Sequence, residues 1–197
     1  MIAIVDYGAG NLRSVRKAFE YCGASVVVTD QPEILRAADK IVLPGVGHFS
    51  TLSVLDRTGI RDALLEAARD GKPFLGICLG MQWLFDGSSE APEVHGAGLL
   101  PGTCQQFPSL VKSPHVGWNS LELREGSLLL RNVGQDAFVY YTHSFHAPMV
   151  GVTVAVSEYG LRFAAAVESH NIFGVQFHPE KSGRVGLFIL KNFCEDA

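Results

Sequence analysis

The chain has 197 residues, of which 47% are hydrophobic and 18% charged, and its formal net charge is −4 at pH 7. These values predict one globular domain over residues 1–197, and the lack of a basic cluster argues against nucleic-acid binding. No apolar run is long enough to span a membrane, and an acid at Asp6 is unlike a signal peptide. The four cysteines form no Cys-x-x-Cys pair, so we expect no metal site, no disulfide framework and a cytoplasmic location.

Strand-like and helix-like segments alternate through the first half of the chain. Strands are predicted over residues 2–5, 25–28, 40–43 and 73–77, and helices over residues 11–21, 32–38, 60–69 and 79–85. Asn11 is expected to cap the first helix, which Gly23 ends. This alternation predicts an α/β fold with a mostly parallel central sheet flanked by helices, and a site at the carboxyl ends of its strands.

The pattern changes to short β-like runs between residues 98 and 168. Strands are predicted over residues 117–123, 138–142, 152–157 and 164–168, separated by Gly, Pro and Asn. A final strand over residues 172–177 and a closing amphipathic helix over residues 185–194 follow. The second half is therefore expected to be rich in antiparallel β-structure, which makes the whole sheet mixed.

A cysteine lies at the junction between a predicted strand and helix, in Gly76-Ile77-Cys78-Leu79-Gly80. This is the cysteine form of the nucleophile elbow, a tight turn that requires small residues two before and two after the nucleophile. The helix that begins at Leu79 directs free amides and its positive end at the sulfur, where they stabilise negative charge. The alternative is an inert buried cysteine beside a Gly-rich helix start.

A second motif, His178-Pro179-Glu180, follows the last predicted strand. Residues two apart in an extended chain point to the same side, and Pro179 favours an extended conformation at His178. Glu180 could then bind one ring nitrogen and leave the other to take a proton from Cys78, as nucleophile, base and orienter. Alone, the motif would be read as a loop-capping cluster.

Two glycine-rich turns follow strands. In Gly45-Val46-Gly47, the backbone of Val46 is free to approach a ligand and could supply a second oxyanion donor beside Leu79, although the turn could be only a turn. The segment from residue 6 to 11 contains a Gly-x-Gly pattern, as a dinucleotide-binding fingerprint does. The fingerprint requires a third glycine at position 13, where this chain has Arg13. A tight turn that exposes Asn11 is the better interpretation.

Two polar, aromatic segments lie in the second half. Trp118, in the segment from residue 114 to 119, is equally compatible with an interface and with the core. His143, at the end of a predicted strand, could contact a substrate or be a structural histidine.

The chain resembles the class I (triad-type) glutamine amidotransferases, and most of all the glutaminase subunits of imidazole glycerol phosphate synthase. The resemblance runs nearly end to end, through residues 6–15, 43–47, 76–82, 114–119, 141–144 and 174–182. It implies that Cys78, His178 and Glu180 hydrolyse glutamine to glutamate and ammonia through a thioester, with the amides of Val46 and Leu79 as oxyanion hole.

The same resemblance implies the remaining contacts. The residues implied to hold glutamine are Gly45, Gln82, Glu90, His143 and Ser144, and Phe145 stands where the family usually has tyrosine. No cofactor is implied. Ammonia would pass to a separate (β/α)8 cyclase subunit, forming a heterodimer, with Asn11, Trp118 and Lys181 on the docking face. The alternatives are a glutaminase that serves another synthase, such as that for pyridoxal phosphate, a cysteine peptidase or esterase, and a binding module without activity.

Overall fold

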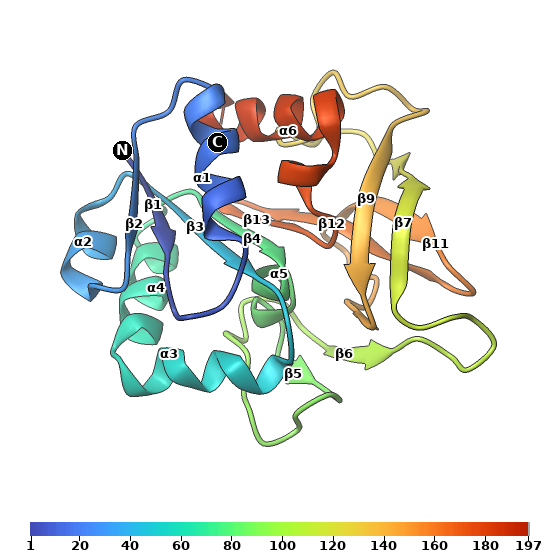
Figure 1. Cartoon of the computed structure of the whole chain (residues 1–197), viewed down its shortest axis with the longest axis horizontal. Helices are drawn as coiled ribbons and strands as arrows, with labels where there is room; N and C mark the ends of the chain where they lie inside the picture. Colours follow the sequence, from blue (N-terminus) through green and yellow to red (C-terminus); the bar gives the residue numbers. More distant parts are fainter. Residues whose placement is uncertain (197) are drawn as a thin grey trace.

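The computed structural model describes residues 1–196, which are built around one eight-stranded sheet (Figure 1). The strand order is β2-β1-β3-β4-β13-β12-β11-β8. The parallel part contains β1 (Ile2–Val5), β2 (Val26–Thr29), β3 (Lys40–Gly45), β4 (Phe74–Cys78) and β13 (Ile172–Val175). The antiparallel part contains β12 (Arg162–Ser169), β11 (Thr153–Glu158) and β8 (Glu122–Leu123). The predicted α/β fold with a mixed sheet is confirmed.

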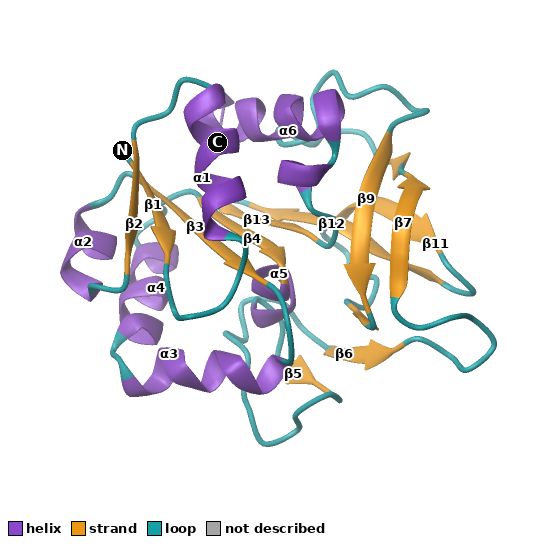
Figure 2. Ribbon diagram, viewed as in Figure 1, coloured by secondary structure: helices purple, strands orange, loops and turns teal. Residues whose placement is uncertain are grey.

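Helices cover both faces of the sheet (Figure 2). Alternate residues of the same strands enter two separate cores, as Ala3 and Ile4 of β1 do, because neighbouring side chains of a strand point to opposite faces. One core packs under α1 (Leu12–Tyr21) and α6 (Gly183–Asp196). The other packs under α2 (Pro32–Ala37), α3 (Val54–Arg57), α4 (Ile60–Arg69) and α5 (Leu79–Trp83). In residues 1–196 no helix combines the length and apolarity that a membrane crossing needs.

Two small sheets stand beside the large one. An antiparallel ribbon is formed by β7 (His115–Ser120) and β9 (Phe138–His143). A three-stranded sheet contains β5 (Gly87–Ser88), β6 (Thr103–Gln106) and β10 (Phe145–His146). Two 3-10 turns, η1 (Phe49–Ser53) and η2 (Pro179–Lys181), complete the elements.

The second half differs from the prediction in one important respect. The single strand predicted over residues 117–123 is wrong, because the chain breaks at Leu121 into β7 and β8, which belong to different sheets. Leu121 is 1% exposed, and its amide donates to the carbonyl of Ala137 rather than to a strand of the central sheet. Leu121 therefore lies where the chain leaves one sheet for the other.

Smaller differences concern the ends of elements. The helix predicted to reach residue 85 ends at Trp83, and the strand predicted to reach residue 177 ends at Val175. The segment of η1 and α3 was not predicted, because its Ser- and Thr-rich start gives no clear helical period. None of these shifts moves the end of β4 away from the end of β3.

Candidate active site

Cys78 occupies a strained turn between β4 and α5. Its backbone angles are φ 54° and ψ −105°, a left-handed conformation that side chains other than glycine rarely adopt. A Cβ on Gly76 would lie 2.5 Å from the carbonyl oxygen of Gly80, and a Cβ on Gly80 would overlap the carbonyl oxygen of Leu43. The turn is therefore possible only with glycine on both sides of Cys78.

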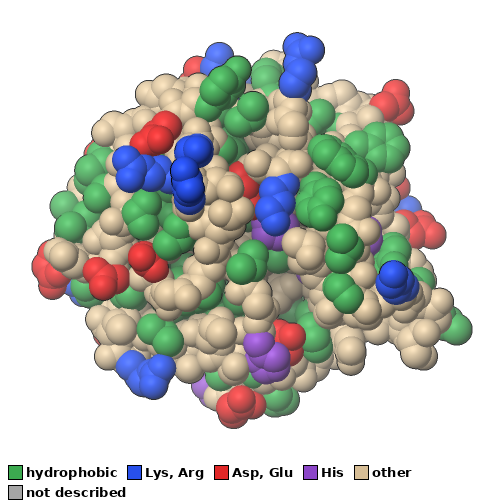
Figure 3. All heavy atoms as spheres, in the orientation of Figure 1, with side chains coloured by type: hydrophobic (Ala, Val, Ile, Leu, Met, Phe, Trp, Pro, Cys, Tyr) green, Lys and Arg blue, Asp and Glu red, His purple; other side chains and the backbone are tan. Residues whose placement is uncertain are grey.

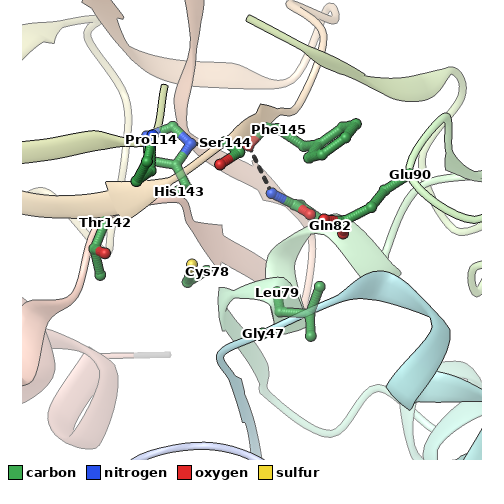
Figure 4. A pocket seen from close by; sticks show the side chains of 10 residues that line it. All are labelled: Gly47, Cys78, Leu79, Gln82, Glu90, Pro114, Thr142, His143, Ser144 and Phe145. Carbon is green, nitrogen blue, oxygen red and sulfur yellow. Dashed lines mark hydrogen bonds between the residues drawn. The ribbon is translucent and has the colours of Figure 1, made fainter. Parts of the chain in front are cut away.

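A pocket of about 280 Å³ opens above Cys78 (Figure 4). It is lined by Gly47, Cys78, Leu79, Gln82, Glu90, Pro114, Thr142, His143, Ser144 and Phe145. This volume is slightly below the usual range for small-molecule sites, roughly 300–1,000 Å³, so it favours a ligand of amino-acid size over a polypeptide. In residues 1–196 no three His, Cys, Asp or Glu side chains come together in a way that could hold a metal ion.

Most of the predicted glutamine contacts share this pocket. The wall includes Gln82, Glu90, His143 and Ser144, together with Leu79 at the start of α5. Gly45 and Val46 are not part of the wall as it stands, although their neighbour Gly47 is. The side chain of Glu90 is held at the rim, because its Oε2 accepts a hydrogen bond from the amide of Phe49 at 2.7 Å.

His178 and Glu180 form a buried pair. The Nδ1 of His178 lies 2.9 Å from Oε1 of Glu180, and the side chains are 2% and 1% exposed. The extended route predicted for this contact is wrong, because Pro179–Lys181 forms the 3-10 turn η2. Only His178 itself is extended, with φ −100° and ψ 95°, and the turn brings the carboxylate back to the ring.

The environment of His178 favours the charged imidazolium. Burial alone would lower the pKa of His178, but the Cys78 sulfur and the Glu180 carboxylate raise it to about 10. The other ring nitrogen, Nε2, is buried and has no hydrogen-bond partner. With Nδ1 occupied by Glu180, Nε2 is the nitrogen left to exchange a proton with Cys78.

The end of β3 lies directly beside Cys78. Gly45 is paired with Cys78 in the parallel register of β3 and β4. A Cβ on Gly45 would collide with the hydroxyl of Tyr7 and with Leu79, so this position also requires glycine. Gly47, two residues on, has φ +105°, and Val46 between them is half-buried. The turn predicted to carry the second oxyanion donor therefore follows the strand that pairs with Cys78.

Sequence reasoning missed one residue next to Cys78. The side chain of Gln176 is fully buried, and its Nε2 donates to the Sγ of Cys78 at 3.8 Å. The available signal was a single amide in the apolar run before His178, because a buried polar group needs hydrogen-bond partners.

Two of the three predicted docking residues meet on one surface. Trp118 on β7 is 56% exposed, so the core interpretation of this tryptophan is wrong. Its ring contacts Tyr140 edge-on at 6.0 Å, and the ammonium of Lys181 lies 5.8 Å from the same ring. Asn11 is the N-cap of α1, which packs against η2, the turn that contains Lys181, and its side chain accepts from the amide of Ser14. Figure 3 shows hydrophobic side chains gathered over β9 and β7, with basic side chains beside them.

Comparison with known proteins identifies the relatives of this chain. Residues 3–197 match the family model described as glutamine amidotransferase class-I. The chain is 52% identical over 197 residues to "Imidazole glycerol phosphate synthase subunit HisH" of Methanothermobacter thermautotrophicus, covering 99% of this chain and 98% of the relative. It is 47% identical to the protein of the same name in Deinococcus radiodurans, covering 98% and 92%.

A solved structure shares the fold. A solved structure described as a glutamine amidotransferase superposes with a TM-score of 0.77 at 18% identity, covering 98% of this chain and 100% of that one. With a family model that spans almost every residue, the chain belongs to the class I glutamine amidotransferases.

Proposed function

We propose that this chain is the glutaminase subunit of an imidazole glycerol phosphate synthase. It hydrolyses glutamine to glutamate and ammonia, and it supplies the ammonia to a cyclase subunit in histidine biosynthesis. One observation carries the chemistry: a cysteine on a strained turn at the base of a small pocket, beside a buried His–Glu pair. The relatives named above carry the assignment to this synthase.

The reaction proceeds in two steps at Cys78. Nε2 of His178 holds the proton of the thiol, and the sulfur attacks the side-chain amide carbon of glutamine. That proton goes to the leaving nitrogen, the C–N bond breaks, and ammonia departs from a thioester. His178 then takes a proton from water, whose oxygen attacks the thioester. The C–S bond breaks, glutamate leaves, and the Cys78 sulfur is again paired with the protonated His178. Glu180 holds the ring and supports the imidazolium that forms in both steps.

The oxyanion of both steps is held by backbone amides. Leu79 supplies one from the first turn of α5, and Val46 supplies the other from the turn after β3. Around the substrate, Gly45, Gln82, Glu90, His143 and Ser144 hold the glutamine; four of these five line the pocket.

The cyclase subunit, a (β/α)8 barrel, docks on the surface that carries Asn11, Trp118 and Lys181. An exposed tryptophan packed on a tyrosine and flanked by a lysine has the composition of a binding hot spot. Loss of such an anchor costs about 2 kcal/mol or more, which is roughly 30-fold in affinity. We expect Trp118→Ala to weaken the complex by that factor in a titration while the melting temperature of the free chain hardly changes. Unchanged affinity would remove Trp118 from the interface.

The decisive experiment uses Cys78→Ala in complex with the cyclase subunit. Glutamine hydrolysis should be abolished, while the synthase reaction with free ammonia should survive, because only the ammonia supply is lost. Glutamate release by the variant would overturn the assignment of Cys78. Peptide and ester substrates, assayed in parallel with the wild type, test the peptidase alternative; turnover of these in place of glutamine would establish it.

The cytoplasm is the natural location for this subunit. All four cysteines are unpaired in the structure, as expected for a reducing compartment.

A further inference from the structure

A chain of buried side-chain amides leads from the pocket wall to the nucleophile. The Nε2 of Gln82 donates to the carbonyl of Phe145 at 2.8 Å, drawn as a dashed line in Figure 4, and to Oε1 of Gln176 at 3.3 Å. The Nε2 of Gln176 in turn donates to Sγ of Cys78 at 3.8 Å. Gln82 is 3% exposed and Gln176 is fully buried, so water does not compete for these bonds.

The direction of this chain is fixed by its first member. The carbonyl of Phe145 can only accept a hydrogen bond, so the amide nitrogen of Gln82 must face it. The second hydrogen of that nitrogen then requires an acceptor, which places Oε1 of Gln176 toward Gln82. Turning Gln176 over would set two donors against each other. Its nitrogen must therefore face the sulfur, and Cys78 is the acceptor.

The same carbonyl also orders the opposite wall. Phe145 accepts a second bond at 2.8 Å from Nδ1 of His143. Both lone pairs of the carbonyl oxygen are then in use, so Gln82 is held by a fixed acceptor rather than by a mobile side chain. A rigid donor next to the sulfur is worth more than a flexible one, because little ordering is needed when charge develops.

We propose that Gln176 is a further catalytic residue, whose side-chain amide stabilises negative charge on the sulfur of Cys78 and fixes its direction. The proposal rests on the role of Cys78 as nucleophile. A thiolate accepts a hydrogen bond far more strongly than a neutral thiol does, so a donor held in this place favours the reactive form. In this role Gln82 is the positioning residue, because it acts on the sulfur only through Gln176.

Other groups near the sulfur must be kept constant in any test. His178 and Tyr7 interact electrostatically with Cys78, and Glu180 acts through His178. Glu90 and His143 face Cys78 across the pocket. Replacing Gln176 by methionine leaves the charge of all five groups unchanged and is close in length, and methionine adapts to buried sites.

The test is the pH dependence of alkylation of Cys78 by iodoacetamide in the full chain, wild type against Gln176→Met. Cys22 and Cys194 are half-buried, so the modification is followed on the peptide that contains Cys78 by mass spectrometry. We expect the profile to move to higher pH by about one unit, which makes alkylation near neutral pH about tenfold slower. An unchanged profile in a folded variant would overturn the proposal.

Two further variants separate the proposed role from a structural one. Asn192→Leu removes another buried amide, which bonds the carbonyls of Leu129 and Arg131 far from the pocket. It should lower stability without moving the profile; an equal shift in this control would contradict the proposal. If Gln176→Met does not fold, Gln82→Met should shift the profile in the same direction by less, because it frees Gln176; no shift there would also refute it.

Kinetics distinguish this proposal from the function on which it rests. Gln176→Met should lower kcat for glutamine more than it changes KM, and the ammonia-dependent synthase reaction should stay unchanged. If Cys78→Ala still hydrolyses glutamine, the proposed function fails, whereas the alkylation profile still reports on Gln176. If Cys78→Ala is inactive but Gln176→Met leaves the profile in place, only the role of Gln176 fails.

Discussion

The strain at Cys78 can be measured by comparing two variants that both lack the thiol, Cys78→Ala and Cys78→Gly. Alanine must adopt φ 54° and ψ −105° with a Cβ, whereas glycine adopts positive φ freely. A non-glycine residue in such a region costs about 1–3 kcal/mol. Exchanging alanine for glycine also has ordinary costs, about 0.5–1 kcal/mol from chain entropy and about 0.8 kcal/mol from one buried methyl group.

These ordinary costs can be measured separately with a reference variant, Ala3→Gly, and subtracted. Ala3 is fully buried in β1, a regular strand, so Ala3→Gly carries the same costs without relief of strain. We expect Ala3→Gly to lower the free energy of unfolding by about 1–2 kcal/mol. At position 78, going from alanine to glycine also relieves the strain. The change in free energy of unfolding from Cys78→Ala to Cys78→Gly should therefore be more favourable than that of Ala3→Gly by about 1–3 kcal/mol.

The assay is urea unfolding of the free chain, with equal m-values required before the free energies are compared. In a chain of this size, 1 kcal/mol corresponds to about 2–4 °C in melting temperature, so thermal unfolding is an independent check. If the two exchanges cost the same, the turn at Cys78 stores no strain, and the reasoning from its backbone angles is refuted.

Three other predictions concern the triad, the oxyanion turn and the buried His115 of β7. Glu180→Gln should reduce glutamine turnover less than His178→Ala, and the double variant should be far from additive; additive losses in kcat would mean that the two residues act separately. The isolated chain should be a poor glutaminase, by about 100- to 1,000-fold, if the amide of Val46 is misaligned until the cyclase subunit docks; equal turnover with and without that subunit and its nucleotide ligand would exclude this gating. Burial lowers the pKa of His115 from 6.5 to about 4, so the unfolded chain binds more protons in this range and stability should fall as the pH drops from 6.5 to 4. His115→Phe should flatten this dependence in urea titrations, and an unchanged slope would show that His115 does not cause it.

The elbow and the parallel half of the fold could be predicted because their signals are local. Gly76 and Gly80 are needed by contacts within the turn and with the adjacent strand, and the β–α alternation follows from hydrophobic periodicity. The antiparallel half of the sheet was harder to predict from the sequence. Whether Leu121 stays in one strand or separates two depends on which core buries it, and this is decided by distant segments.

Within the site, too, a contact between residues close in the sequence could be predicted, and one between distant residues could not. The pairing of His178 with Glu180 was predicted from their spacing, but the turn that makes the pairing was not, because Pro179 is compatible with both an extended chain and a 3-10 turn. The contact of Gln176 with Cys78 joins residues 98 positions apart. Nothing near either residue in the sequence indicates that they touch.

The place of β13 in the sheet has a consequence for synthesis of the protein. This strand lies between β4 and β12, so it joins the parallel half of the sheet to the antiparallel half, and the residues directly after it include Gln176 and His178. A chain still emerging from the ribosome contains Cys78 long before it contains the strand that brings the histidine. Cys78 therefore has no His178 beside it until the two half-sheets are closed, and under the proposed mechanism a partly made subunit does not hydrolyse glutamine.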